Sequence, residues 1–249
     1  EGNRFGEAGS SVVIEEFLRG EEASFIVMVD GNNILPMATS QDHKARDNND
    51  LGPNTGGMGA YSPAPVVSEV VFKDAMERVI KPTVSAMKKE GMPYTGFLYA
   101  GLMIDHNEKV KVLEYNCRFG DPETQPIMMR LRTNLGKLCL AATRGKLDQE
   151  QVEWSHKTAL GVVMAAKGYP DSYDKGDTIT LPNASSDSKV FHAGTKLDDG
   201  NILSDGGRVL CATSLGVDLE EAQKRAYQLV KKVSWDGSYY RTDIGFKGL

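Results

Sequence analysis

Two strand-turn-strand patterns most constrain what this 249-residue chain can fold into. In residues 24–38, and again in residues 95–115, two apolar runs flank a short polar turn, which predicts two β-hairpins. Residues 12–18 form one more short apolar run, and we expect it to be a strand as well. The first half of the chain is therefore expected to be built on sheet.

Helical periodicity appears in two further stretches. Residues 68–90 carry apolar side chains at helical spacing, with Pro82 at an expected kink and Gly91 as the expected stop. Residues 127–142 predict a second helix that ends near Gly145. Between residues 41 and 65 almost nothing is periodic, so we expect a long loop there.

The last hundred residues have a pattern of their own. Strands are predicted at residues 159–166, 189–193 and 208–213, and a capping-box sequence at residues 218–221 predicts the start of a helix. The polar stretch at residues 146–157 separates this part from the rest. We therefore expect an α+β fold with two domains, residues 1–150 and residues 151–249.

Composition excludes several classes of protein. A net charge of -5 argues against a nucleic-acid partner held by a basic field, and no apolar run approaches the roughly 18 residues needed to cross a membrane. The three cysteines form no CxxC pair, which disfavours a disulfide framework or a zinc site. We expect a cytoplasmic protein, and the first residues suggest a chain that begins inside a domain.

One pair of residues suggests a metal site. Strand alternation places Glu114 and Asn116 on the same face at the end of the second hairpin. Their carboxylate and amide oxygens suit Mg²⁺, which takes few protein ligands and completes its shell with water and phosphate oxygens. The alternative is that the two residues merely end an exposed strand.

The loop at residues 116–126 concentrates charge beside glycine and proline. Arg118 can present its fork of donors to phosphate or carboxylate, and Asp121 and Glu123 can accept hydrogen bonds from an amine. A bound amino acid would engage both signs of charge. A solvated charged turn is the alternative reading.

Two weaker signals lie near the start of the chain. Residues 14–22 are an apolar run followed by a short connection, where backbone donors and acceptors can meet an adenine edge, although many sheet proteins contain such a segment. The glycines of residues 52–61 let backbone N–H groups approach an anion closely. This loop is neither a Walker A loop nor a dinucleotide-binding fingerprint, because neither pattern is complete.

Residues 118–125, with the sequence RFGDPETQ, resemble the signature of the glycinamide ribonucleotide synthetase family, which are ATP-grasp ligases that join glycine to 5-phosphoribosylamine. Residues 13–18, 41–44, 53–63 and 191–195 resemble the same family, so the resemblance covers nearly the whole chain. It implies the second lobe of an ATP-grasp domain, an antiparallel sheet with helices, followed by a small α+β carboxyl-terminal domain.

The resemblance also implies roles for individual residues. Glu16, Phe17 and Leu18 would form the adenine hinge, and Glu22 would bind the ribose hydroxyls. Glu114 and Asn116 would hold Mg²⁺ or Mn²⁺, Arg118 would act on the transferring phosphoryl group, and Lys44 would bind a phosphate. The substrates would be bound by Asp42, Asn54, Thr55, Gly56, Gly57, Gly59, Asp121 and Glu123.

The implied reaction uses ATP to convert glycine to glycyl phosphate, which phosphoribosylamine attacks to give glycinamide ribonucleotide, ADP and phosphate in purine synthesis. Related enzymes carry an amino-terminal region with a glycine-rich phosphate loop and an adenine-facing lysine, so we expect this chain to need that region and to be inactive alone. No acidic residue lies between residues 98 and 103 to join Glu114 at the metal. The alternatives are another purine-pathway ATP-grasp ligase or a non-catalytic fragment that only binds substrate.

Overall fold

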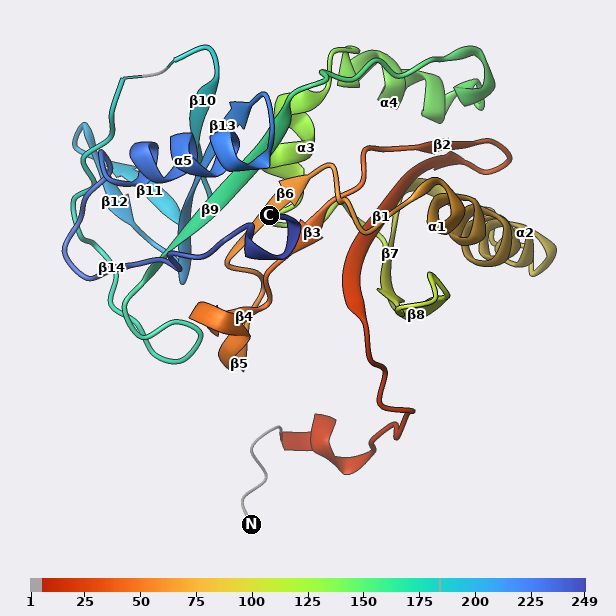
Figure 1. The fold of residues 1–249 in the computed structure, drawn as a ribbon, viewed down its shortest axis with the longest axis horizontal. Helices are drawn as coiled ribbons and strands as arrows, with labels where there is room; N and C mark the ends of the chain where they lie inside the picture. The colour runs from red at the N-terminus through yellow and green to blue at the C-terminus, as the bar shows by residue number, and fades with distance from the viewer. Residues whose placement is uncertain (1–5, 184) are drawn as a thin grey trace.

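Two antiparallel sheets lie next to each other in the computed structural model, which describes residues 6–183 and 185–249 (Figure 1). The first sheet has the strand order β2-β1-β7-β8. Its members are β1 (Glu21–Asp30), β2 (Ile34–Pro36), β7 (Thr95–Ile104) and β8 (Val110–Asn116). Both predicted hairpins are confirmed, because β1 pairs with β2 and β7 pairs with β8.

One face of the first sheet is covered by a long helix that matches the predicted stretch at residues 68–90. It begins as α1 (Glu69–Asp74), continues through a π-helical segment, η3 (Ala75–Ile80), and ends as α2 (Lys81–Lys89). Ser68 caps its first turn by accepting a hydrogen bond from the amide of Val71. The helix buries an apolar stripe against the sheet, and each large side chain so buried contributes about 1.5–3 kcal/mol.

The helix predicted at residues 127–142 is two helices in the structure: the first packs mainly on the other sheet, and the second covers the opposite face of this one. α3 (Thr124–Arg130) and α4 (Leu135–Thr143) are separated at Leu131, whose backbone turns extended and pairs with Trp154. Asn134 then starts α4 as its cap, accepting a hydrogen bond from the amide of Lys137 at 3.0 Å. The cap at Asn134 and the strand-like contact of Leu131 divide the predicted helix in two. Because helices lie on both sides, the last eight residues of β1 are buried.

The second sheet has the strand order β10-β13-β9-β6-β3, with β14 added beside β9. Its strands are β3 (Gln41–Asp42), β6 (Gly59–Ser62), β9 (Thr158–Ala166), β10 (Ser188–His192), β13 (Arg208–Gly216) and β14 (Ser238–Tyr239). The three predicted strands are confirmed, and so is the capped helix, α5 (Leu219–Val230), which packs on β13 and β9. Asp218 Oδ1 accepts from the amide of Glu221 at 2.8 Å.

The aperiodic stretch at residues 41–65 is more regular than predicted. Besides β3 and β6 it contains a two-stranded ribbon of β4 (Ala45–Asp47) and β5 (Leu51–Asn54). Strands of two to four residues are too short to show alternation, and β6 is buried along its whole length. A second ribbon, β11 (Thr195–Asp198) with β12 (Asn201–Ser204), lies beyond β10.

The two sheets are joined at Ser24 in β1 and Ser40 just before β3. Each amide donates to the carbonyl of the other residue, at 2.8 Å and 3.3 Å. β3 and β6 come from the first part of the chain but share a sheet with strands that follow residue 157. The boundary between residues 150 and 151 stays a prediction, and the second sheet draws strands from both sides of it.

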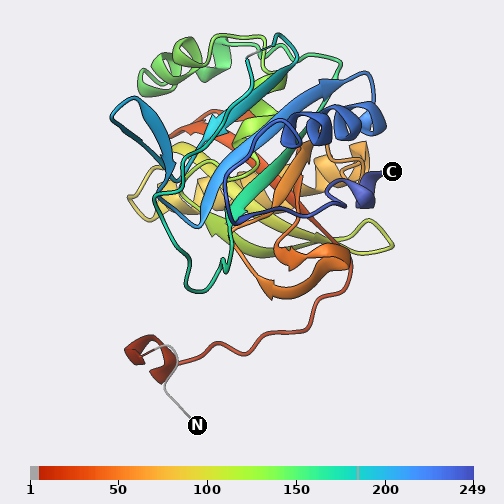
Figure 2. The same cartoon turned by 90° about the vertical axis from the view of Figure 1, so that its left-hand side faces the viewer.

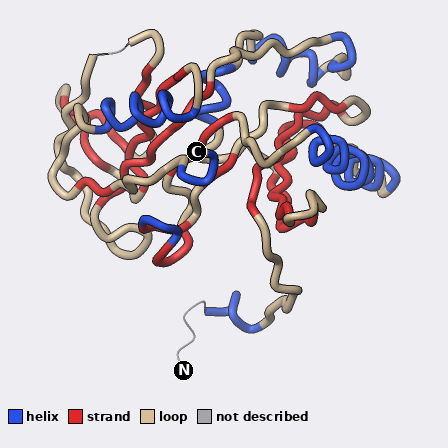
Figure 3. The backbone as a smooth tube through the Cα atoms, in the orientation of Figure 1, coloured by secondary structure: helices blue, strands red, loops and turns tan. Residues whose placement is uncertain are grey.

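The predicted strand at residues 12–18 is wrong. This segment has no strand pairing in the structure, and it runs away from both sheets as an extended loop (Figures 2 and 3). Val13 and Ile14 are 86% and 91% exposed, since no neighbouring strand covers them in the described residues. Over those residues, no helix is both long and apolar enough to cross a membrane.

Candidate active site

A cavity of about 320 Å³ lies where the two sheets meet. It brings together segments far apart in the sequence, from the start of the second sheet, the end of β8 and the loop after β8. Its lining includes ten of the predicted site residues and one that was not predicted, Tyr99. The ten are Asp42, Lys44, Asn54, Thr55, Gly56, Glu114, Asn116, Arg118, Asp121 and Glu123.

The predicted metal pair lies at the end of β8. Asn116 Nδ2 donates to Glu114 Oε1 at 3.2 Å, so the two side chains share one face as strand alternation predicts. The described residues contain no cluster of three or more acidic, histidine or cysteine side chains placed to hold a metal ion. Two oxygen-bearing side chains beside an open cavity fit a Mg²⁺ ion that takes its other ligands from water and phosphate.

Two cations line the same cavity. Lys44 Nζ lies 2.9 Å from Glu22 Oε2 in an ion pair. Burial by itself lowers the pKa of Lys44, but attraction to Asp42 and the pair with Glu22 outweigh burial and raise it, so the ammonium is charged. Arg118 is exposed and donates to the carbonyl of Phe119 at 3.0 Å, which leaves most of its donors available.

Two carboxylates are buried at the back of the cavity. Asp42 and Glu123 are only 7% and 3% exposed. Ser24 Oγ donates to Glu123 Oε1 at 2.8 Å and shares a 2.9 Å hydrogen bond with the hydroxyl of Tyr99. Burial raises the pKa of Asp42 and the charge of Glu123 raises it further, while Lys44 opposes both. The pocket therefore contains a carboxyl group able to exchange a proton near neutral pH.

The backbone that carries Asp42 and Lys44 is fixed by His43 between them. The amide of His43 donates to the carbonyl of Gly59 at 2.9 Å, and its Nε2 accepts from the amide of Gly245 at 3.2 Å. Burial lowers the pKa of His43 to about 4, so the ring is neutral. Gly59 does not line the cavity, because it lies in β6 and pairs with β9.

Gly57 does not line the cavity, but its neighbour Gly56 does. Gly57 has a φ of +112°, and a side chain there would lie 2.4 Å from the ring of Pro122. Only glycine can adopt this conformation at so close a contact without strain. The glycine-rich loop is thereby packed against the loop that carries Asp121 and Glu123.

The predicted adenine hinge lies elsewhere. Glu16, Phe17, Leu18 and Glu22 line a second cavity of about 680 Å³ beside β8. Glu16 forms an ion pair with Lys111 of that strand, and Phe17 is 84% exposed. Glu22 belongs to both places, because it lines this cavity and pairs with Lys44 of the other.

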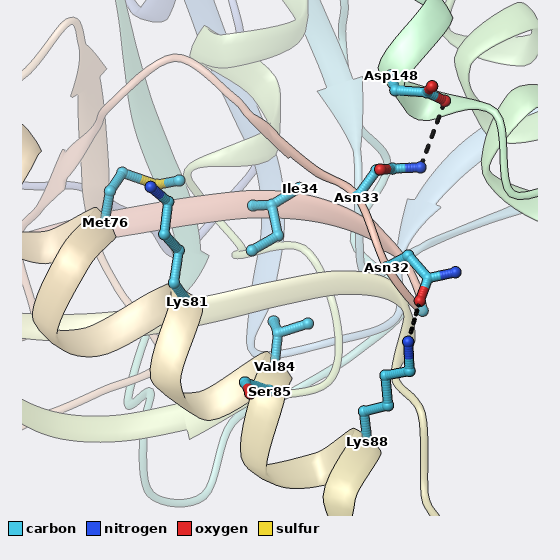
Figure 4. A pocket seen from close by; sticks show the side chains of 10 residues that line it. Asn32, Asn33, Ile34, Met76, Lys81, Val84, Ser85, Lys88 and Asp148 are labelled. Atoms are coloured by element: carbon cyan, nitrogen blue, oxygen red, sulfur yellow. Dashed lines mark hydrogen bonds between the residues drawn. The ribbon is translucent and has the colours of Figure 1, made fainter.

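A further cavity of about 500 Å³ lies between the turn after β1 and helix α2 (Figure 4). Several polar groups there are already paired, since Lys88 Nζ donates to Asn32 at 2.6 Å and Asn33 donates to Asp148 at 3.3 Å. None of the predicted site residues lines it. Its size therefore does not make it the candidate site.

Three residues important to the pocket were missed in the sequence. Ser24 and Tyr99 lie within apolar strand runs, where a single polar side chain gave no signal, although Tyr99 is paired with Asn116 across the hairpin. Arg208 in β13 donates to the carbonyl of Asp121 at 2.6 Å and to that of Gly56 at 2.7 Å. It is 87 residues from Asp121, and no local pattern connects the two.

Comparisons with known proteins identify the family. The sequence profile of the phosphoribosylglycinamide synthetase ATP-grasp (A) domain matches residues 1–124, and that of the C domain matches residues 159–247. A phosphoribosylamine–glycine ligase of Vibrio parahaemolyticus is 63% identical over 250 residues, which are 100% of this chain and 58% of that relative. The chain thus spans about three fifths of the length of such relatives.

Solved structures give the same result for the fold. The crystal structure of phosphoribosylamine–glycine ligase from Thermotoga maritima is similar with a TM-score of 0.84 and 39% identity, over 92% of this chain and 56% of that one. A biotin carboxylase from Campylobacter jejuni shares the fold at a TM-score of 0.66 and 13% identity, over 91% of this chain and 48% of that one. The expected α+β ATP-grasp fold is confirmed, and the chain belongs to the phosphoribosylglycinamide synthetase family.

Proposed function

We propose that this chain is the carboxyl-terminal part of a ligase that uses ATP to join glycine to 5-phosphoribosylamine, giving glycinamide ribonucleotide, ADP and phosphate. The observation that carries the proposal is the cavity at the sheet junction, where cations, carboxylates and a pair of metal-type ligands converge. Glycine carries both an ammonium and a carboxylate, and the second substrate carries an amine and a phosphate. A pocket with both signs of charge suits these reactants.

The proposed reaction has two steps. A carboxylate oxygen of glycine attacks the γ-phosphorus of ATP, the bond from that phosphorus to ADP breaks, and glycyl phosphate results. The amine of phosphoribosylamine then attacks the carbonyl carbon, loses a proton, and displaces phosphate. Arg118 and Lys44 stabilise the negative charge on the transferring phosphoryl group, because fixed cations aimed at developing charge lower a barrier without reorganising.

The carboxylates act on the amines. Asp121 and Glu123 orient them by accepting hydrogen bonds, and Asp42, with its raised pKa, accepts the proton that the attacking amine releases. Asn54, Thr55 and Gly56 also line the cavity. In this proposal they contact the substrates. No side-chain nucleophile is needed, since the site mainly positions charged reactants and protects a labile intermediate from water.

Glu114 and Asn116 would hold a divalent ion, Mg²⁺ or Mn²⁺, which when bound would offset phosphate charge. Glu16, Phe17 and Leu18 contact the adenine, and Glu22 reaches the ribose. An amino-terminal region of the same enzyme completes the grip on ATP, so this chain alone does not turn over. The net charge of -5 suits an enzyme of small molecules rather than of nucleic acid, and we place it in the cytoplasm.

The test is ADP release by this chain joined to the amino-terminal region that its family carries. ATP alone, ATP with glycine, and ATP with glycine and freshly made phosphoribosylamine are compared. Release that requires both co-substrates is expected. Release with a different carboxylic acid or amine, and none with this pair, would replace the proposal with another ATP-grasp specificity.

A further inference from the structure

Arg208 forms a clamp between two loops of the candidate pocket. Its Nη1 donates to the carbonyls of Gly56 at 2.7 Å and Asp121 at 2.6 Å, and more distantly to Gly57 at 3.4 Å. Its Nη2 lies 3.1 Å from Asp121 Oδ2. In the described residues these are the only partners of the side chain, and all of them belong to the two loops.

The approach of Arg208 to the glycine loop is very close. A side chain on Gly56 would lie 2.9 Å from Cζ of the guanidinium, so Arg208 would have to move to make room for it. On the other side, the amide of Gly56 donates to the hydroxyl of Tyr169 at 3.1 Å. Both backbone groups of this residue are therefore held by side chains that follow β9 or begin β13.

The strand that carries Arg208 is itself anchored. The pairing of β13 with β9 shifts register between Arg208 and Leu210, and such a bulge re-aims the neighbouring side chain. The carbonyl of Arg208 accepts from the amide of Gly194 at 3.0 Å. Gly194 belongs to the segment at residues 191–195, which resembles the family but otherwise has no role in the proposed reaction.

We propose that Arg208 is a positioning residue, which holds the loop of Asn54, Thr55 and Gly56 against the loop of Asp121 and so sets the width of the substrate pocket. This inference rests on the proposed function for its substrates. A planar guanidinium suits the task, because one rigid fork serves two carbonyls and a carboxylate at once. A lysine offers a single point charge and cannot span all three.

We expect a change at Arg208 to impair the use of glycine or phosphoribosylamine and to leave the binding of ATP nearly unchanged. In the full-length enzyme, Arg208→Met should lower kcat/KM for glycine or phosphoribosylamine by about 10- to 100-fold, because small misplacements in an active site have effects of that order. Arg208→Lys should restore part of the loss. The KM for ATP should change less than about threefold, since roughly 0.6 kcal/mol is all that such a change represents.

Hydrogen exchange gives a readout that does not depend on the reaction. Arg208→Met should speed exchange of the amides in residues 51–58 and 119–124 and leave α1 and α2 unchanged. Arg225→Met is the matched control, because Arg225 in α5 also bonds a carbonyl and carboxylates, those of Leu215, Glu221 and Asp187, away from the pocket. If Arg208→Met does not fold, Arg208→Lys is measured in both assays.

Hydrogen exchange and kinetics together test whether Arg208 clamps the two loops. Faster exchange confined to the two loops, with a loss in kcat/KM that lysine partly rescues, supports the clamp. Unchanged exchange relative to Arg225→Met, or a KM for ATP that rises as much as the other constants, overturns it. A wild-type enzyme that ignores glycine would refute the proposed function, while the exchange result would still decide whether Arg208 fixes the loops.

Discussion

The substrate pocket and the segment at residues 12–18 are both suggested by short motifs, yet the chain builds them to very different degrees. In the pocket, Glu123 is 3% exposed and bonded to Ser24, and its loop is clamped by Arg208. In the other segment, Ile14 is 91% and Phe17 is 84% exposed. Contacts within this chain therefore set the geometry of the pocket, whereas the segment at residues 12–18 is joined to β8 by the ion pair of Glu16 with Lys111 and leaves its apolar side chains exposed.

Among changes that test this difference between the pocket and the segment, we expect the largest loss of activity from a change at Arg118. Arg118→Lys in the full-length enzyme should lower kcat by about 100- to 1000-fold, the range typical of losing one donor to developing charge. The KM for ATP should change little, because a point charge still attracts phosphate but loses the planar fork. Steady-state kinetics measure both, with Arg144→Lys at the exposed end of α4 as control. Equal losses in turnover and ATP affinity would contradict the assignment.

The metal pair should give the next largest effect. Glu114→Gln removes the charged ligand, so the free Mg²⁺ concentration for half-maximal activity should rise about 10- to 100-fold, as for other perturbed metal sites. Titration with Mg²⁺ at saturating ATP measures this shift. Glu77→Gln, in an exposed pair with Lys81, serves as the control. An unchanged requirement for Mg²⁺ would remove Glu114 from the metal site.

The buried carboxyl of Asp42 predicts opposite effects on stability and activity. Its pKa is raised in the folded protein, so its contribution to the free energy of unfolding is present at acid pH and is lost as the pH rises through the folded pKa. Asp42→Asn should therefore raise the melting temperature more at pH 8 than at pH 5, while kcat falls.

Thermal unfolding at the two pH values measures the effect on stability, with the exposed Asp236→Asn as control. Each unit of pKa difference corresponds to about 1.4 kcal/mol, so the effect is large enough to detect. An equal shift in melting temperature at both pH values would show that burial of the ionised Asp42 carboxylate does not destabilise the fold.

The smallest effect is expected in the exposed segment. Phe17→Ala should raise the KM for ATP about fivefold, equivalent to roughly 1 kcal/mol, and leave kcat and the KM for glycine nearly unchanged. Val70→Ala, which removes another exposed apolar side chain, is the control. A fall in kcat with no change in the KM for ATP would contradict the separate roles given to the pocket and to the segment.

The sequence predicted what local patterns can encode. Both hairpins, the long helix and the cap of α5 were found, because each depends on neighbours within a few residues. The segment at residues 12–18 was mistaken for a strand, since its apolar side chains are present but no strand in the described part of the chain pairs with it. The break between α3 and α4 depends on Trp154, which is distant in the chain.

The candidate site likewise contains residues that local patterns could predict and residues that they could not. Ten predicted residues converge on one cavity: five lie at the end of the second predicted hairpin or in the loop after it, and five lie in the stretch at residues 41–65 that we predicted as a long loop. The buried hydrogen bonds of Ser24 and Tyr99, and the contacts of Arg208, cross 75 or more residues and follow from the packing of the two sheets. The chemistry of the pocket could be predicted, and the side chains that hold it in place could not.

The central claim, ligation through glycyl phosphate, is tested most directly by following oxygen. Glycine labelled with ¹⁸O in its carboxylate is supplied to the full-length enzyme with ATP and phosphoribosylamine, and the released phosphate is examined by mass spectrometry. The account predicts one labelled oxygen in each phosphate, because a glycine oxygen bridges to phosphorus and leaves with it. Unlabelled phosphate released alongside the amide product would contradict it.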